Sequence, residues 1–234
     1  MDTPNSSPPP KIGIIVCSTR TPRVCPQIAQ FVQTTIQSAK PDTDNPHTPV
    51  LSTTHLIDLA TWNLPMYNEP GIPSQIKDPS EYTHAHTRAW SAEIARYDAF
   101  IFVTPQYNWG YPAVIKNAID YLYDEWSGKP AAVISYGGHG GGKANRQLRE
   151  VLAGVRMRVV EKGVELAFPG REVLVKAAAG EDIGLGNANG NGNGNGEGEG
   201  EGEGEGEVVV GFWVDERKEI EEAYREILRV LESV

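Results

Sequence analysis

Short apolar runs, separated by segments with helical periodicity, constrain the fold of this chain more than any other feature. The runs Lys11–Cys17, Ala99–Val103 and Ala131–Ser135 are almost wholly apolar and contain many β-branched or small residues. Continuous runs of this length are typical of strands that are buried on both faces of a parallel sheet. A chain with several such strands needs helices to cover both faces of the sheet.

Apolar residues three or four positions apart predict the helices between these strands. After Pro26, for example, Ile28, Val32 and Ile36 share one helix face. Further helices are predicted within Ser80–Tyr97, Pro112–Tyr123, Lys143–Val155 and Glu216–Val234, and further strands at His55–Leu59 and Gly163–Ala167. With right-handed crossovers, the predicted fold class is α/β, a flavodoxin-like three-layer sandwich with a five-stranded parallel sheet of order 2-1-3-4-5. Ligands of such folds bind beyond the carboxyl ends of the strands.

Composition narrows the class of protein further. The net charge is −10, and removing the six glutamates of the tract Glu197–Glu207 leaves −4, so we expect no nucleic-acid binding. No apolar run is long enough to cross a membrane, and Met1–Pro10 is polar and proline-rich, unlike a secretory signal. Two cysteines, Cys17 and Cys25, are typical of a reducing compartment. These observations predict a cytoplasmic protein.

Most of the chain is predicted to form one domain, but two segments contain too few apolar groups to fold. We expect residues 11–234 to form the single domain and residues 1–10 to be a disordered tail. Within it, residues 184–206 repeat Gly-Asn and then Gly-Glu, which predicts a disordered insert. This insert is interpreted as an expanded linker; an acidic interaction tract is the alternative. Trp62–Ser74 contains three prolines and is predicted to be irregular.

The loop at residues 17–25 follows the first predicted strand and has the groups that a phosphate needs. The hydroxyls of Ser18 and Thr19, the N–H groups at the start of the next helix and the charge of Arg20 could surround a phosphate. Neither a P-loop motif nor a Gly-x-Gly-x-x-Gly motif is present. The alternative interpretation is a capped helix start with surface arginines.

The loop at residues 104–112 follows the third strand and alternates aromatic and amide side chains. Tyr107, Trp109 and Tyr111 offer ring faces, while Gln106 and Asn108 offer polar groups. This combination suits a flat heteroaromatic ring with polar edges. The alternative is a rigid loop whose aromatic side chains pack in the core.

The loop at residues 136–143 follows the fourth strand and has five glycines in six positions. Glycines allow the backbone to approach a ligand closely, although a flexible connector has the same composition. His139 is the single histidine in these loops and is interpreted as an orienting or surface residue rather than a base. No Ser-His-Asp, Cys-His or metal-ligand constellation stands out, so we expect neither a protein nucleophile nor a metal site.

Together these loops resemble the NADPH-dependent FMN reductase family of the flavodoxin-like fold, in particular its fungal NAD(P)H-dependent FMN and quinone reductases. The resemblance covers roughly residues 11–168. Ser18–Arg20 is similar to the family's phosphate loop, and residues 104–121 (TPQYNWGYPAVIKNAIDY) are similar to its signature. Residues 135–142 (SYGGHGGG) are similar to its third loop, and residues 62–70 resemble the loop over its active site.

The resemblance implies FMN as the cofactor, NADPH or NADH as the electron donor, and a set of binding residues. The FMN phosphate would be bound by Ser18, Arg20, Arg23, Val24 and Cys25, and the isoalloxazine ring by Pro105, Gln106, Tyr107, Asn108, Gly137, Gly138 and His139. On the substrate side it implies Tyr67, Trp109 and Tyr111. It also implies a homodimer, with the helix from Pro112 and the segment around Trp126 near the interface.

The implied activity is hydride transfer from NAD(P)H to bound FMN and then to a quinone or free flavin, with both substrates using one site in turn. FMN carries this chemistry, so no catalytic side chain is implied. Three alternatives stay open on sequence alone: an azo- or chromate-type reductase with the same site, a flavodoxin-type electron carrier, and a redox-gated binding module.

Overall fold

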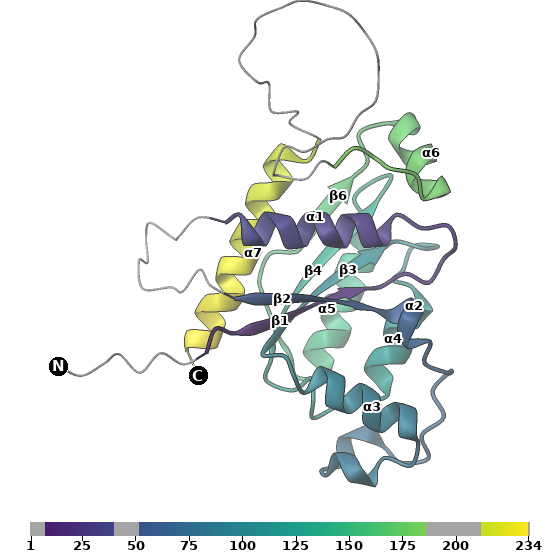
Figure 1. Cartoon of the computed structure of the whole chain (residues 1–234), viewed down its shortest axis with the longest axis vertical. Coiled ribbons are helices and arrows are strands. Elements are labelled where there is room, and N and C mark those ends of the chain that lie inside the picture. The colour runs from purple at the N-terminus through teal and green to yellow at the C-terminus, as the bar shows by residue number, and fades with distance from the viewer. Residues whose placement is uncertain (1–7, 40–51, 186–211, 234) are drawn as a thin grey trace, which may run out of the picture.

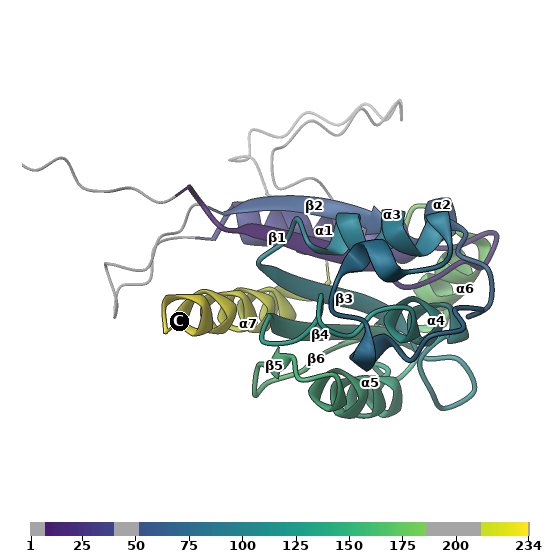
Figure 2. The same ribbon diagram turned by 90° about the horizontal axis from the view of Figure 1, so that it is seen from below.

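The chain folds around one parallel sheet with helices on both faces (Figure 1). The computed structural model describes residues 8–39, 52–185 and 212–233. Its strands are β1 (Lys11–Val16), β2 (Thr53–Asp58), β3 (Ala99–Pro105), β4 (Pro130–Gly137), β5 (Arg158–Val159) and β6 (Val164–Ala167). All pairings between them are parallel, in the order β2-β1-β3-β4-β5 with β6 also on β4, and Figure 2 shows this succession. The predicted fold class and strand order are confirmed.

The fifth position of the sheet is shared by two short strands rather than filled by one. The predicted fifth strand is β6, which pairs with Ile134–Gly137 at the carboxyl end of β4. β5 was not predicted; it pairs with Pro130 and Ala131 at the start of the same strand. The chain leaves the sheet between the two at the exposed Glu161 and Lys162. A two-residue strand is too short to show any periodicity in a sequence.

The helices are α1 (Cys25–Gln37), α2 (Leu59–Trp62), α3 (Ala85–Ile94), α4 (Ala113–Asp120), α5 (Gly142–Gly154), α6 (Arg171–Ala179) and α7 (Val214–Glu232), with 3-10 turns η1 (Pro73–Gln75) and η2 (Pro79–Glu81). The five predicted helices correspond to α1, α3, α4, α5 and α7. The prediction of an irregular segment at Trp62–Ser74 holds apart from its ends, which lie in α2 and η1. α6 was not predicted. Among the described residues, no helix combines the length and apolar character needed to span a membrane.

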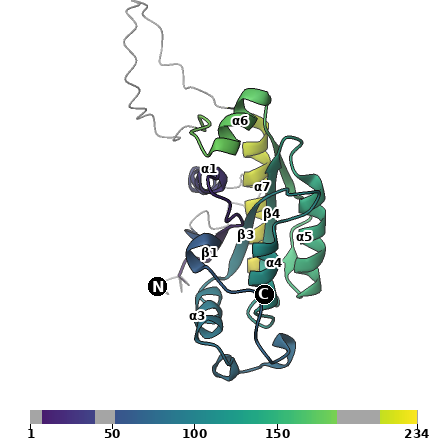
Figure 3. The ribbon, with the colours of Figure 1, turned by 90° about the vertical axis from the view of Figure 1, so that its right-hand side faces the viewer.

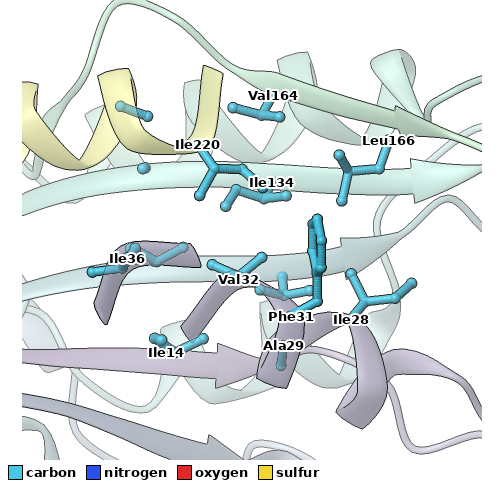
Figure 4. Packing of buried hydrophobic residues seen from close by; sticks show 14 of the residues in the cluster. Ile14, Ile28, Ala29, Phe31, Val32, Ile36, Ile134, Val164, Leu166 and Ile220 are labelled. Atoms are coloured by element: carbon cyan, nitrogen blue, oxygen red, sulfur yellow. The ribbon is translucent and has the colours of Figure 1, made fainter. Parts of the chain in front are cut away.

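The apolar core forms two layers, one on each face of the sheet. α1 and α7 pack against one face, where Ile14 of β1 and Ile134 of β4 meet Phe31 of α1 and Ile220 of α7 (Figure 4). α3, α4 and α5 cover the other face. Trp126, which the family resemblance places near a dimer interface, is fully buried in this second layer, with its ring centroid 5.1 Å from that of Phe100.

Both predicted low-complexity segments lie largely outside the described residues. Of the tail, residues 8–10 are described, and they lead into β1 without regular structure. Of the insert at 184–206, residues 184 and 185 are described, and Leu185 packs in the core on the α1 side of the sheet. The rest of the insert is outside the described residues.

Candidate cofactor-binding site

The three loops singled out in the sequence meet at the carboxyl ends of β1, β3 and β4. They surround a pocket of about 180 Å³. Its lining residues are Arg20, Arg23, Val24, Pro105, Gln106, Tyr107, Tyr136, Gly137, Gly138, Phe168, Leu174, Ala177 and Ala178. The parallel sheet explains the meeting, because all its strands end at the same edge.

An ion pair fixes the β1–α1 loop before α1 begins. The guanidinium of Arg23 donates two hydrogen bonds to the carboxylate of Asp58 at the end of β2, at 2.7 and 2.6 Å, and a third to the carbonyl oxygen of Ser18 at 2.5 Å. Burial alone would raise the pKa of Asp58, but the bonds from Arg23 and from the N–H of Ala60 hold that pKa below its usual range. Arg23 therefore lines the pocket with much of its charge already neutralised.

Ser18 joins the first loop to the second. Its side chain is fully buried, and its hydroxyl lies 2.8 Å from the Tyr107 hydroxyl. Below it, the thiols of Cys17 and Cys25 are also fully buried. Burial raises the pKa of the Cys25 thiol to about 12 and raises that of Cys17 as well, so both thiols stay protonated at neutral pH.

The β3–α4 loop makes a tight reversal that exposes Trp109. The backbones of Tyr107 and Gly110 exchange hydrogen bonds of 2.8 and 3.0 Å across the reversal. Asn108 and Trp109 at its tip have φ values of +46° and +69°, a left-handed conformation that is unfavourable for a tryptophan. The Trp109 side chain is 70% exposed and lies over the ammonium of Lys143.

Gln106 joins the second loop to the third. Its side-chain oxygen accepts the backbone N–H groups of Lys143 and Ala144 at 3.0 and 3.3 Å, and so caps the first turn of α5 from another element. Within the third loop, Gly140 and Gly141 have positive φ, and a Cβ on Gly141 would lie 3.0 Å from the Tyr136 carbonyl oxygen. Ser135 donates to the carbonyl oxygen of Gly140 at 2.8 Å. The third loop is therefore held in shape and is not a loose connector.

Eight of the residues predicted to bind the cofactor line the pocket. They are Arg20, Arg23, Val24, Pro105, Gln106, Tyr107, Gly137 and Gly138. The other four do not: Ser18 and Cys25 are buried beneath the loops, and Asn108 and His139 are exposed outside the lining. The cofactor contacts of all twelve stay predictions.

The residues predicted on the substrate side also lie outside the pocket lining. Trp109 and Tyr67 are exposed, and Tyr111 is half-buried. Tyr67 lies on the segment between α2 and η1, where its N–H donates to the side-chain oxygen of Asn117 in α4 at 2.8 Å. Asn117 in turn donates to the carbonyl oxygen of Pro65 at 2.7 Å, so α4 holds this segment in place.

Sequence reasoning missed one wall of the pocket. Tyr136 lies one residue before the end of β4, Phe168 follows β6, and Leu174, Ala177 and Ala178 come from α6. A helix signal was present, because Gly180 follows the run of alanines with a left-handed φ of +70° and is the C-cap of α6. Nothing in the sequence shows that this helix would return to the first loop.

The lining suits a flavin mononucleotide in charge and in shape. Arg20 supplies positive charge for a phosphate, while Pro105 and the Tyr107 ring supply apolar surface for a flat ring. A Cβ built on Gly137 or Gly138 would make ordinary van der Waals contacts, at 3.9 Å with the Gly141 nitrogen and 4.0 Å with Leu174, so the absence of a side chain leaves the backbone accessible from the pocket that both glycines line. A larger hollow of about 740 Å³ between Lys162 and α7 is lined mostly by charged side chains and does not suit an aromatic ring.

The sequence model of the NADPH-dependent FMN reductase family matches residues 10–169, which include all three loops. The chain belongs to this family. It is therefore an oxidoreductase, of a family that uses FMN with NADH or NADPH as the electron donor.

Similarity to individual proteins agrees with this family. The chain is 49% identical over 161 residues to the NAD(P)H-dependent FMN reductase LOT6 of Saccharomyces cerevisiae, covering 68% of this chain and 81% of that protein. It is 41% identical over 97 residues to a quinone reductase of Pseudomonas putida, covering 38% and 48%. Among solved structures, an oxidoreductase of Corynebacterium diphtheriae has the same fold, with a TM-score of 0.59, 17% identity and coverage of 97% and 100%.

Proposed function

We propose that this family member binds FMN in the pocket between its three loops and uses NAD(P)H to reduce a quinone or a free flavin. The observation that carries the proposal is the lining of this pocket, in which two arginines from one loop share a cavity with Pro105, Gln106 and Tyr107 from a second and Gly137 and Gly138 from a third. Bound FMN would supply the hydride chemistry, and the chain would bind and orient it.

Arg20 is the residue we assign to the phosphate. Arg23 already donates to the Asp58 carboxylate and to the Ser18 carbonyl, so its role is mainly to shape the loop. The hydrogen bonds of Arg20 within the described residues both come from one terminal nitrogen, Nη2. A guanidinium carries five N–H donors, so the others can reach a phosphate.

Gln106 is the residue we assign to a polar edge of the ring. Its oxygen is held by the first turn of α5, which fixes the orientation of the amide. The amide nitrogen of a side chain held in this way can donate to a ring carbonyl or ring nitrogen. Gly137 and Gly138 leave room for the backbone to lie against the opposite edge.

The acceptor is the finer part of the proposal. Trp109 and Tyr67 expose aromatic rings that a flat acceptor can stack against. The similarity to a protein named as a quinone reductase supports a quinone as the acceptor.

We further propose a cytoplasmic homodimer, and the exposed apolar side chains of Met66 (76% exposed) and Ile72 (59%) support an interface.

The proposal is tested with the visible spectrum of the purified protein. We expect a yellow protein, or one that turns yellow with added FMN, whose absorbance bleaches when NADPH or NADH is added without oxygen. The colour should then return when a benzoquinone is added. A protein that neither binds FMN nor oxidises NAD(P)H contradicts the proposal, and one that bleaches but is not reoxidised by quinones or flavins contradicts the acceptor.

A further inference from the structure

α6 extends across the pocket from the first loop to the third. At its C-terminal end, the carbonyl oxygens of Ala177 and Ala178 accept hydrogen bonds from Arg20 at 3.4 and 2.5 Å. Earlier in the helix, the side chain of Leu174 lies 4.0 Å from the Cβ position of Gly138. Figures 1 and 3 both place α6 above the N-terminal end of α1, where the first loop ends.

The attachment of α6 to the first loop continues beyond Arg20. The side chain of Gln27 in α1 donates to the carbonyl oxygens of Gly180 and Glu181 at 3.3 and 3.0 Å, and its oxygen accepts the N–H of Ile183 at 3.4 Å. Gly180 packs so closely that a Cβ there would lie 2.8 Å from the Cβ of Pro22. The C-terminal end of α6 is therefore docked on the segment that we assign to the phosphate.

The pocket is small for a ligand site, and α6 forms part of its wall. Ligand pockets usually enclose about 300–1,000 Å³, whereas this one measures about 180 Å³. α6 contributes Leu174, Ala177 and Ala178 to its lining. Leu174 remains 41% exposed, so packing within the described residues leaves much of its side chain uncovered.

The positive charge of Arg20 can interact both with the C-terminal end of α6 and with a bound phosphate. The C-terminal end of a helix carries partial negative charge and would repel a phosphate placed beside it. Arg20 lies at this end and lines the pocket, and its bonds to α6 use only the Nη2 nitrogen. One guanidinium can therefore bind the helix end and a phosphate together, which neutralises the repulsion.

We propose that α6 is a cover over the flavin site: Leu174 packs on the bound cofactor, Arg20 links the phosphate to the end of the helix, and Gln27 positions the helix. The strength of this attachment then determines how long FMN stays bound. The inference rests on the proposed flavin site and goes beyond it, because α6 lies outside residues 10–169, the part matched by the family model.

Leu174 is tested against its neighbour on the same helix. Val175 is 58% exposed and does not line the pocket. We expect Leu174→Ala to raise the FMN dissociation rate on the order of tenfold, since tenfold corresponds to ~1.4 kcal/mol and a buried leucine carries at least that much apolar contact. Val175→Ala should leave the rate within twofold, and the melting temperature of the FMN-free protein should change little in both. Equal rates for both variants overturn the role of Leu174.

Gln27 is tested by hydrogen exchange, with Gln30→Ala on the exposed surface of α1 as its control. FMN should slow exchange in α6 of the wild-type protein, and Gln27→Ala should weaken this protection and speed FMN release several-fold. If FMN slows exchange in the loops at 18–25, 105–107 and 137–138 but leaves the exchange rate of α6 unchanged, α6 does not cover the flavin, although the proposed flavin site is supported. If FMN protects none of these segments, the proposed flavin site itself is wrong.

Discussion

The guanidinium of Arg23 and the carboxylate of Asp58 form a two-point ion pair, with N–O distances of 2.7 and 2.6 Å. The pair links the loop after β1 to the end of the neighbouring strand β2. Asp58 also accepts the N–H of Ala60 at 3.0 Å and caps α2. One carboxylate therefore fixes two adjacent connections at the edge of the sheet where the pocket opens.

Loss of this carboxylate should destabilise the protein at neutral pH. We expect Asp58→Asn to lower the free energy of unfolding at pH 7 by on the order of 1–3 kcal/mol, because Arg23 loses its charged partner. The pKa of Asp58 is lowered in the folded protein, so the contribution of the carboxylate is complete above its unfolded pKa of about 4 and is lost as the pH falls through the folded value.

Urea unfolding of both proteins at neutral pH and at about pH 2–3 checks this expectation. The difference in stability between wild type and variant should shrink in acid. Asp124→Asn serves as the control, since Asp124 forms a more exposed pair with Lys77. A difference that is the same at both pH values would contradict the prediction.

Replacement of Arg20 should weaken the retention of FMN. Arg20→Ala removes a charge-assisted contact, which contributes on the order of 1.5–3 kcal/mol, or about 10- to 150-fold in affinity. Fluorescence titration with FMN measures the change. Arg96→Ala, at an exposed arginine in a different part of the chain that pairs with Glu93, should bind FMN like the wild type. Unchanged affinity in Arg20→Ala would refute the assignment of the first loop.

Replacing Trp109 by glycine should maintain or slightly increase stability but weaken acceptor binding. Its φ of +69° costs about 1 kcal/mol relative to glycine, so Trp109→Gly should keep or slightly raise the free energy of unfolding. If the ring stacks on the acceptor, the same change should raise the KM for a benzoquinone several-fold, while Trp109→Phe keeps most of the affinity. Steady-state kinetics and thermal melts test both parts, and unchanged kinetics in Trp109→Gly would exclude Trp109 from the substrate side.

Lys129 should make stability rise with pH in the alkaline range. Burial lowers the pKa of its ammonium to about 8, and its nitrogen donates to the carbonyl oxygen of Ile94 at 2.9 Å. Between this value and the unfolded pKa of about 10.4, the unfolded chain binds more protons, so deprotonation favours the folded state. The stability of the wild type relative to Lys129→Met should therefore increase from pH 7 to pH 10. A pH-independent difference would show that Lys129 keeps its usual pKa.

The sequence predicted the parts of the site that follow long buried strands. β1, β3 and β4 are apolar runs, so the loops after them could be assigned to the same edge of a parallel sheet. The family signature at 104–121 then indicated the ligand. It could not show that the Ser18 hydroxyl faces Tyr107 or that Gln106 caps α5, because those contacts join residues 89 and 37 positions apart.

Apolar periodicity by itself determined the α/β class and the place of the loops, because strand and helix patterns depend on neighbouring residues. The strand order was inferred from the flavodoxin-like fold that five alternating strands fit, and the pairings confirm it. The tertiary structure decided which side chains reach the pocket. It pairs Arg23 with Asp58, buries Cys25, and turns α6 back so that its end meets Arg20. Such contacts depend on how distant segments pack against one sheet, and the local spacing of residues does not predict that packing.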